Sequence, residues 1–261
     1  MALGRSPEPI WFPPLTTAQS LTVAAAQAQN VSKAGYAHWR WPGALNRQGS
    51  AHFARVCAVT GEETCRMRLD RGMDAIAGSL ITAFDYVWGR LTGRLAGLTD
   101  DEYFWEPVAG CWSLRQGGDG RWHLDGGGGG GPAPDPVPVT TIAWRLGHLG
   151  GMAVGGFASR RFGDAALTTG QIAFAATAAD VTAFLDEHYR NWRSGLTGLT
   201  PAGWAAPLGP PWGPYAKDNT VDLALHVLDE VIHHGAEVAL LRDLYSHRSS
   251  LRGQGAVPRS G

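Results

Sequence analysis

Residues 220–245 read TVDLALHVLDEVIHHGAEVALLRDLY, a stretch in which apolar side chains recur every three or four residues. On a helical wheel, several of them fall within about 40° of His234 and define one face: Leu223, Val227, Val238 and Leu241. Such a face is typical of a helix that packs against a core. The stretch therefore predicts a helix that begins after a cap at Asn219 or Thr220 and ends near Tyr245.

Three further stretches have the same helical periodicity. They run from about Met73 to a break at Gly97, from a cap at Thr140 or Thr141 to about Gly163, and from Thr177 through Leu196. Together with the stretch at 220–245 they give four helices of roughly 20 to 27 residues, and we find no convincing β segment. The pattern predicts an all-α protein, an antiparallel four-helix bundle over residues 73–245.

Three segments fall outside this pattern. Residues 1–66 have no sustained helix or strand period, and we expect a poorly structured extension, for which a start codon assigned upstream of Met67 or Met73 is one explanation. Residues 117–138 are rich in Gly and Pro, include six consecutive glycines, and predict a flexible surface insertion. Residues 246–261 are polar, and we expect a disordered tail.

The composition argues against two classes of partner and favours one compartment. Lys and Arg total 22 against 23 for Asp and Glu, so a net charge of −1 gives no field that would attract nucleic acid or an anionic membrane. No stretch approaches the roughly 18 consecutive apolar residues of a membrane-spanning helix. The cysteines, Cys57, Cys65 and Cys111, are too few and too irregular for a disulfide-stapled secreted domain, so we expect a cytoplasmic protein.

The predicted last helix also carries a candidate metal site. Glu230 and His234 are four residues apart, which places two donor side chains on adjacent turns beside the core-facing stripe. A buried carboxylate needs a partner or a cation. His148, on a glycine-rich face of the second helix, offers a third donor.

Plainer explanations exist for each of these residues. A single histidine on an apolar face is more often a hydrogen-bonded core residue than a metal ligand. Glu230 could instead pair with an arginine: Arg90, Arg94 or Arg145. His226 and His233 lie in the wheel sector of the acidic residues Asp222 and Asp229, which indicates a solvated stripe or an outer layer around a site. Cys111 is a candidate nucleophile. Nothing in the sequence places its thiol beside a base, so we expect a structural role.

Four motifs add weight to the metal hypothesis. They are FDYVW at 84–88, WEPVAGCWS at 105–113, TIAWRLGHL at 141–149 and EVIHHGAEVALLRDLY at 230–245. With these motifs the chain resembles the DinB-like (DinB/YfiT) superfamily of metal-binding four-helix bundles over about residues 73–245. The resemblance implies a divalent-metal site made by His148, Glu230 and His234.

Glu230 departs from the commonest family pattern, which has a histidine at that position. A His, Glu, His set is similar to that of the mycothiol-dependent maleylpyruvate isomerase branch and is compatible with zinc. The resemblance thus implies a metal-dependent S-transferase or isomerase that activates a low-molecular-weight thiol, such as mycothiol or bacillithiol, toward a small-molecule substrate. It also implies a homodimer by analogy. The alternative is a non-catalytic metal-binding or stress-associated helical bundle.

Overall fold

The computed structural model describes residues 62–128, 134–163 and 167–253. The predictions made for residues 1–61, for the middle of the glycine tract and for residues 254–261 lie outside this part of the chain. Within it the protein is mostly helical, which confirms the all-α class.

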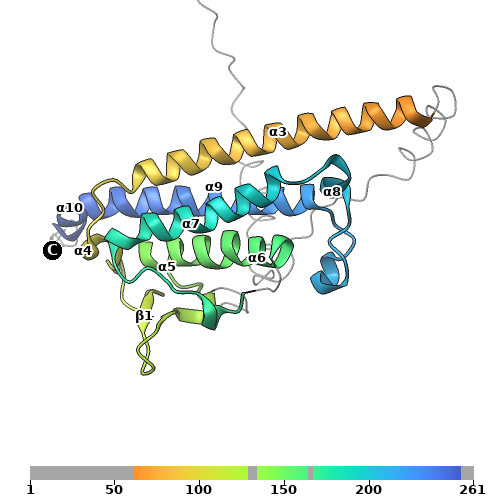
Figure 1. The fold of residues 1–261 in the computed structure, drawn as a ribbon. Helices are drawn as coiled ribbons and strands as arrows, with labels where there is room; N and C mark the ends of the chain where they lie inside the picture. Colours follow the sequence, from red (N-terminus) through yellow and green to blue (C-terminus); the bar gives the residue numbers. More distant parts are fainter. Residues whose placement is uncertain (1–61, 129–133, 164–166, 254–261) are drawn as a thin grey trace, which may run out of the picture. The chain divides into compact units, whose positions relative to one another are not determined.

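Four long helical segments make up most of the described chain (Figure 1). They are α3 (Glu62–Arg94), the continuous segment α5 (Ile142–Gly147), η2 (His148–Gly156) and α6 (Phe157–Phe162), then α7 (Ala178–Thr197), and α9 (Thr220–Ser246). Helix α3 packs on α7 and α9, and the α5–η2–α6 segment packs on the same two helices from the opposite side. The shorter helical elements connect these segments: α4 (Asp100–Tyr103), η1 (Asp125–Gly128), η3 (Thr169–Gln171), α8 (Pro201–Ala205), η4 (Pro210–Tyr215) and α10 (Arg248–Gly253).

Polar side chains start three of the long segments where the sequence predicts. Thr141 accepts a hydrogen bond from the backbone N–H of Trp144, and Thr177 does the same at the start of α7. Asn219 accepts from two backbone N–H groups of the first turn of α9. These caps satisfy donors that have no partner within the helix, which fixes each start. Helix α3, in contrast, begins at Glu62 and not near Met73.

The second predicted helix contains a π-helical stretch that periodicity did not reveal. Residues His148–Gly156 form a π-helix, and α5 and α6 continue it on either side. Here α7 approaches so closely that a Cβ on Gly150 would lie 2.6 Å from the Phe184 ring, and one on Gly155 would lie 2.4 Å from Nδ1 of His188. Side chains at these glycines would push the two helices apart.

A small hairpin corrects the expectation that the chain has no β structure. Strands β1 (Leu114–Gln116) and β2 (Trp122–Leu124) pair antiparallel, with Leu114 opposite Leu124. Both leucines are buried against the helices. The hairpin and the turn η1 extend to Gly128 and so include the first half of the insertion that we expected to be flexible, residues 117–138. Likewise, α10 forms where we expected only a disordered tail.

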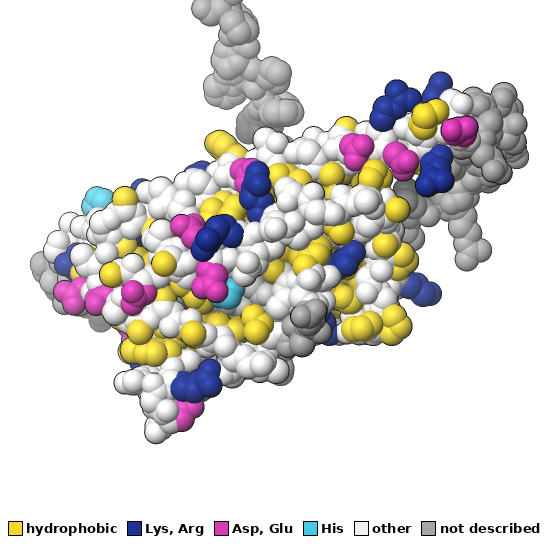
Figure 2. Space-filling model, viewed as in Figure 1, with side chains coloured by type: hydrophobic (Ala, Val, Ile, Leu, Met, Phe, Trp, Pro, Cys, Tyr) yellow, Lys and Arg dark blue, Asp and Glu magenta, His cyan; other side chains and the backbone are white. Residues whose placement is uncertain are grey.

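The core is built from apolar side chains of the four long helical segments. In α3 the buried side chains include Leu80, Phe84, Trp88 and Leu91, whereas Ile76 is 48% exposed and does not belong to the core. On the face seen in Figure 2, acidic and basic side chains are interspersed. Among the described helices, none combines the length and the apolar character required to span a bilayer.

Candidate metal centre

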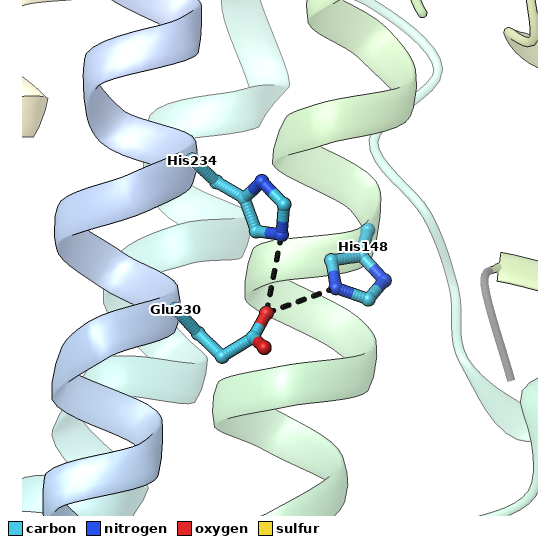
Figure 3. A group of neighbouring side chains, drawn as sticks. All are labelled: His148, Glu230 and His234. Atoms are coloured by element: carbon cyan, nitrogen blue, oxygen red, sulfur yellow. Dashed lines mark hydrogen bonds and ion pairs between the residues drawn. The ribbon is translucent and has the colours of Figure 1, made fainter. Parts of the chain in front are cut away.

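His148, Glu230 and His234 meet in the structure (Figure 3). His148 is the first residue of η2, and the other two lie one turn apart on α9. Oε2 of Glu230 is 3.2 Å from Nε2 of His148 and 3.1 Å from Nε2 of His234. Two segments distant in the sequence therefore bring two imidazole nitrogens to one carboxylate oxygen.

The spacing of these atoms fits a divalent metal. The three ligand atoms all lie within 4.8 Å of one another. Two ligands bound at 2.0–2.1 Å to a tetrahedral zinc ion are about 3.3 Å apart, close to both nitrogen–oxygen distances in the cluster. Three protein donors would leave at least one coordination position for another ligand.

Hydrogen bonds outside the cluster orient both imidazoles. Nδ1 of His148 lies 2.7 Å from the carbonyl oxygen of Gly128, and Nδ1 of His234 lies 2.6 Å from Oε2 of Glu237. Both acceptors require a proton on Nδ1, so the neutral rings present the bare lone pair of Nε2 to Glu230. Three electron-rich atoms then face one another. That arrangement is favourable only when a proton or a metal ion lies among them.

The electrostatics of the metal-free cluster agree with this need for positive charge. Burial by itself raises the pKa of Glu230, but hydrogen bonds from His148 and His234 outweigh it and hold the pKa far below its usual value. Burial also opposes protonation of His234, yet its contacts with Glu230 and Glu237 raise its pKa. Both shifts favour positive charge at the place that a metal ion would take.

Glu237 has a partner of its own on the other side of His234. Oε2 of Glu237 lies 3.0 Å from Nε of Arg145. Nη1 of Arg145 also lies 3.4 Å from Nδ1 of His234, but the shorter contact with the carboxylate determines where the Nδ1 proton points. The group His233, His234 and Glu237 has metal-binding donors as well, and Arg145 already supplies the positive charge there.

These contacts bear on two alternatives that the sequence left open, the arginine partners of Glu230 and the place of His226 and His233. Glu230 has two histidine partners, whereas Arg145 pairs with Glu237, Arg94 pairs with Asp243 and Arg90 lies over the ring of Tyr86. Within the described residues, the pairing of Glu230 with any of these arginines is therefore wrong. His226 and His233 are exposed. Their ring nitrogens lie 3.9 Å from Glu230 and 3.3 Å from Glu237, respectively, which agrees with an outer layer around the cluster.

An aromatic ring supports His148 from one side. The indole of Trp144 is stacked on the imidazole of His148, with ring centroids 5.2 Å apart and planes 7° from parallel. Trp144 itself is buried, and its Nε1–H donates to the backbone carbonyl of Asp125 at 2.9 Å. The two residues are one turn apart, so the stack restricts rotation of the ligand ring.

Cys111 has the surroundings of a structural residue. It is buried, and its thiol donates to the carbonyl oxygen of Val108. Burial raises the pKa of the Cys111 thiol, which disfavours the nucleophilic thiolate.

Two groups at the site were missed in the sequence. Glu237 lies seven residues after Glu230, on the same helical face, so the wheel that placed His234 could have revealed it. The carbonyl of Gly128 could not be found in this way, because every residue has a carbonyl and only the fold shows which one faces His148.

Comparison with known families agrees with this geometry. The sequence model of the DinB superfamily matches residues 83–238, more than half of the chain. The chain belongs to the DinB superfamily. No curated protein and no solved structure matches the chain significantly. The match covers all three residues of the cluster and fixes the family, while the branch within the DinB superfamily stays a prediction.

Proposed function

We propose that this DinB protein binds a divalent metal ion through His148, Glu230 and His234. The observation that carries the proposal is the orientation of the two imidazoles, whose Nδ1 atoms face acceptors while both Nε2 atoms face Oε2 of Glu230. A histidine that binds a metal typically donates its other ring N–H to a carbonyl or carboxylate, and both histidines have such a partner.

Zinc is the ion that we propose for this site. Two imidazole nitrogens and one carboxylate oxygen make a donor set typical of catalytic zinc sites, which keep a position open. The site is also within reach of solvent, since the side chains of His148 and Glu230 are 16% and 22% exposed, whereas His234 is 4% exposed.

We further propose that the metal centre serves an S-transferase or isomerase that uses a low-molecular-weight thiol of the mycothiol or bacillithiol type. When bound, a zinc ion supplies a Lewis acid that lowers the pKa of a thiol. The charges of this site support an anionic partner. One carboxylate and two neutral imidazoles leave a dication with net positive charge, and Arg145 already balances Glu237. The likeness of the ligand set to the maleylpyruvate isomerase branch is the second support.

A non-catalytic metal-binding protein is the alternative to a thiol-dependent enzyme. Two of the hollows on the described chain lie away from the cluster. One runs along α3 from Asp74 to Tyr86, and the other lies between Arg94 and Arg242. Neither includes a residue of the cluster, so neither provides a substrate pocket beside the metal.

Three broader proposals accompany the metal site. The antiparallel four-helix bundle is supported by the contacts of α3 with α7 and α9 and of α5 with α9. A homodimer and a cytoplasmic location stay predictions. Light scattering of the purified protein and cell fractionation would test them.

Metal analysis of the purified protein tests the site. We expect about one zinc ion per chain in the wild type and in His123→Ala, whose side chain pairs with Asp119 away from the cluster. We expect a large loss of zinc in His148→Ala and in His234→Ala. Unchanged zinc content in both variants would refute the site. Conjugation of a thiol to an electrophile by the wild type, but not by these variants, would then favour the enzyme over the non-catalytic alternative.

A further inference from the structure

The structure describes the glycine tract as far as Gly128, and this part of the tract contacts His148 of the proposed metal site. The turn η1, residues Asp125–Gly128, follows β2 directly. Two of its backbone carbonyl groups contact side chains of the α5–η2 segment. The carbonyl oxygen of Gly128 lies 2.7 Å from Nδ1 of His148, and that of Asp125 accepts from Nε1 of Trp144 at 2.9 Å.

The hairpin holds this turn in place. Oδ2 of Asp125 accepts hydrogen bonds from the backbone N–H of Ser113 at 2.9 Å and from Nε of Arg115 at 2.8 Å. Arg115 also pairs with Glu106 at 2.8 Å. The turn is therefore attached to β1 at one end while its carbonyl groups face Trp144 and His148.

The path of the turn requires glycine. Gly126, Gly127 and Gly128 have φ values of +64°, +65° and +80°, a left-handed conformation that other residues rarely adopt. A Cβ at Gly126 would also lie 2.4 Å from the ring of Trp112, and one at Gly128 would lie 3.3 Å from Leu124 and Met152. Three consecutive glycines let the backbone bring the Gly128 carbonyl to the imidazole.

We infer that the turn Asp125–Gly128 is a positioning element for the metal ligand His148. The Gly128 carbonyl holds the Nδ1 proton, and the Asp125 carbonyl holds Trp144, which stacks on the same imidazole. The ring is thus fixed at its edge and on its face, with Nε2 directed at Glu230. The inference rests on the proposed metal site and assigns a role to a tract whose composition alone indicates only a flexible insertion.

Zinc affinity in a matched pair of glycine variants tests the inference. Gly128→Ala forces a left-handed alanine against Leu124 and Met152 and displaces the carbonyl. Gly97→Ala introduces a left-handed alanine at a similar φ of +72°, where the Cβ meets nothing within 4 Å. We expect zinc affinity, measured by competition with a chelator, to fall about 10- to 100-fold in Gly128→Ala and to be unchanged in Gly97→Ala. Equal affinities in the two variants would overturn the inference and leave the metal site intact.

Nuclear magnetic resonance of the zinc-loaded wild type gives a readout that needs no variant to fold. With ¹⁵N-labelled histidine, we expect zinc on Nε2 of His148 and a proton on Nδ1 that exchanges slowly because the Gly128 carbonyl accepts it. Zinc on Nδ1, or a rapidly exchanging Nδ1 proton, would overturn the inference. A wild-type protein that takes up no zinc would instead refute the proposed metal site, and this inference with it.

Discussion

Replacing Glu230 by glutamine removes the charge at the centre of the cluster and almost none of its volume. Oε2 of Glu230 is the atom that contacts both imidazoles, at 3.2 and 3.1 Å. An amide in its place is neutral and a much poorer ligand for zinc. Loss of an outer-layer partner already weakens metal binding about 10- to 100-fold, so we expect Glu230→Gln to weaken zinc binding at least 100-fold.

The loss can be measured as a change in thermal stability. Free zinc at 100 times its Kd stabilises the folded wild type by about 2.7 kcal/mol, whereas a variant with a 100-fold higher Kd gains only about 0.4 kcal/mol. For a protein of this size, 1 kcal/mol shifts Tm by about 2–4 °C. We therefore expect zinc to raise Tm by about 5–11 °C in the wild type and by about 1–2 °C in Glu230→Gln.

Differential scanning calorimetry of metal-free protein, with and without added zinc, gives both shifts. Each shift is taken relative to the same variant without zinc, so a lower starting Tm of Glu230→Gln does not affect the comparison. Glu187→Gln, a matched change at an exposed glutamate of α7, should keep the full wild-type shift. If Glu230→Gln shows the same zinc-induced shift as Glu187→Gln, the carboxylate is not a ligand and the reasoning fails.

Three further predictions concern the packing, the acid stability and the outer layer of the site. Gly150→Ala should lower the free energy of unfolding by about 1–3 kcal/mol in urea titrations, because its Cβ would lie 2.6 Å from the buried Phe184 ring. Glu237→Gln should weaken zinc binding about 10- to 100-fold in chelator competition, since it removes the charged acceptor of the Nδ1 proton of His234. Asp85, whose pKa is lowered chiefly by its hydrogen bond from Arg193, should stabilise the fold fully above about pH 4 and lose that effect as pH falls through its folded-state pKa. The difference in unfolding free energy between the wild type and Asp85→Asn should therefore shrink on acidification.

Each of these predictions has a result that contradicts it. Gly156→Ala is the control for the packing prediction, because its Cβ would meet only a backbone oxygen at 3.5 Å. An equal effect of Gly150→Ala and Gly156→Ala would argue against the close approach of α7. Unaltered zinc affinity in Glu237→Gln would remove that residue from the site. A difference between the wild type and Asp85→Asn that stays constant down to pH 2 would show that the pKa of Asp85 is not lowered.

The parts of the structure that could be predicted from sequence depend on neighbours along the chain. The caps at Thr141, Thr177 and Asn219 follow from side chains that reach the backbone two or three residues ahead. The pairing of Glu230 and His234 follows from one turn of helix. The approach of His148 to that pair is different, because no local rule brings two helices together, and for that residue the family resemblance was needed.

The parts that could not be predicted depend on contacts between distant segments or on the backbone. Strands β1 and β2 have three residues each, too few to show an alternating pattern, and the pairing of Leu114 with Leu124 depends on the core beneath them. The exposure of Ile76 has a similar cause. Its spacing fits the apolar face of α3, and only the arrangement of the other helices leaves it without a cover.

The glycines on either side of His148 explain why a glycine-rich sequence can hold a precise site. In η2, Gly150 and Gly155 let α7 pack closely and fix the backbone that carries His148. In η1, Gly128 brings a carbonyl oxygen to the Nδ1 of the same residue. Glycine costs conformational entropy on folding, so its concentration around one side chain is favourable only where close backbone contacts offset that cost. Gly150→Ala and Gly155→Ala should therefore reduce the stability of the metal-free protein, whereas Gly128→Ala should mainly reduce its affinity for zinc. If both kinds of substitution changed the two properties in the same proportion, the separate roles assigned to the two glycine segments would be wrong.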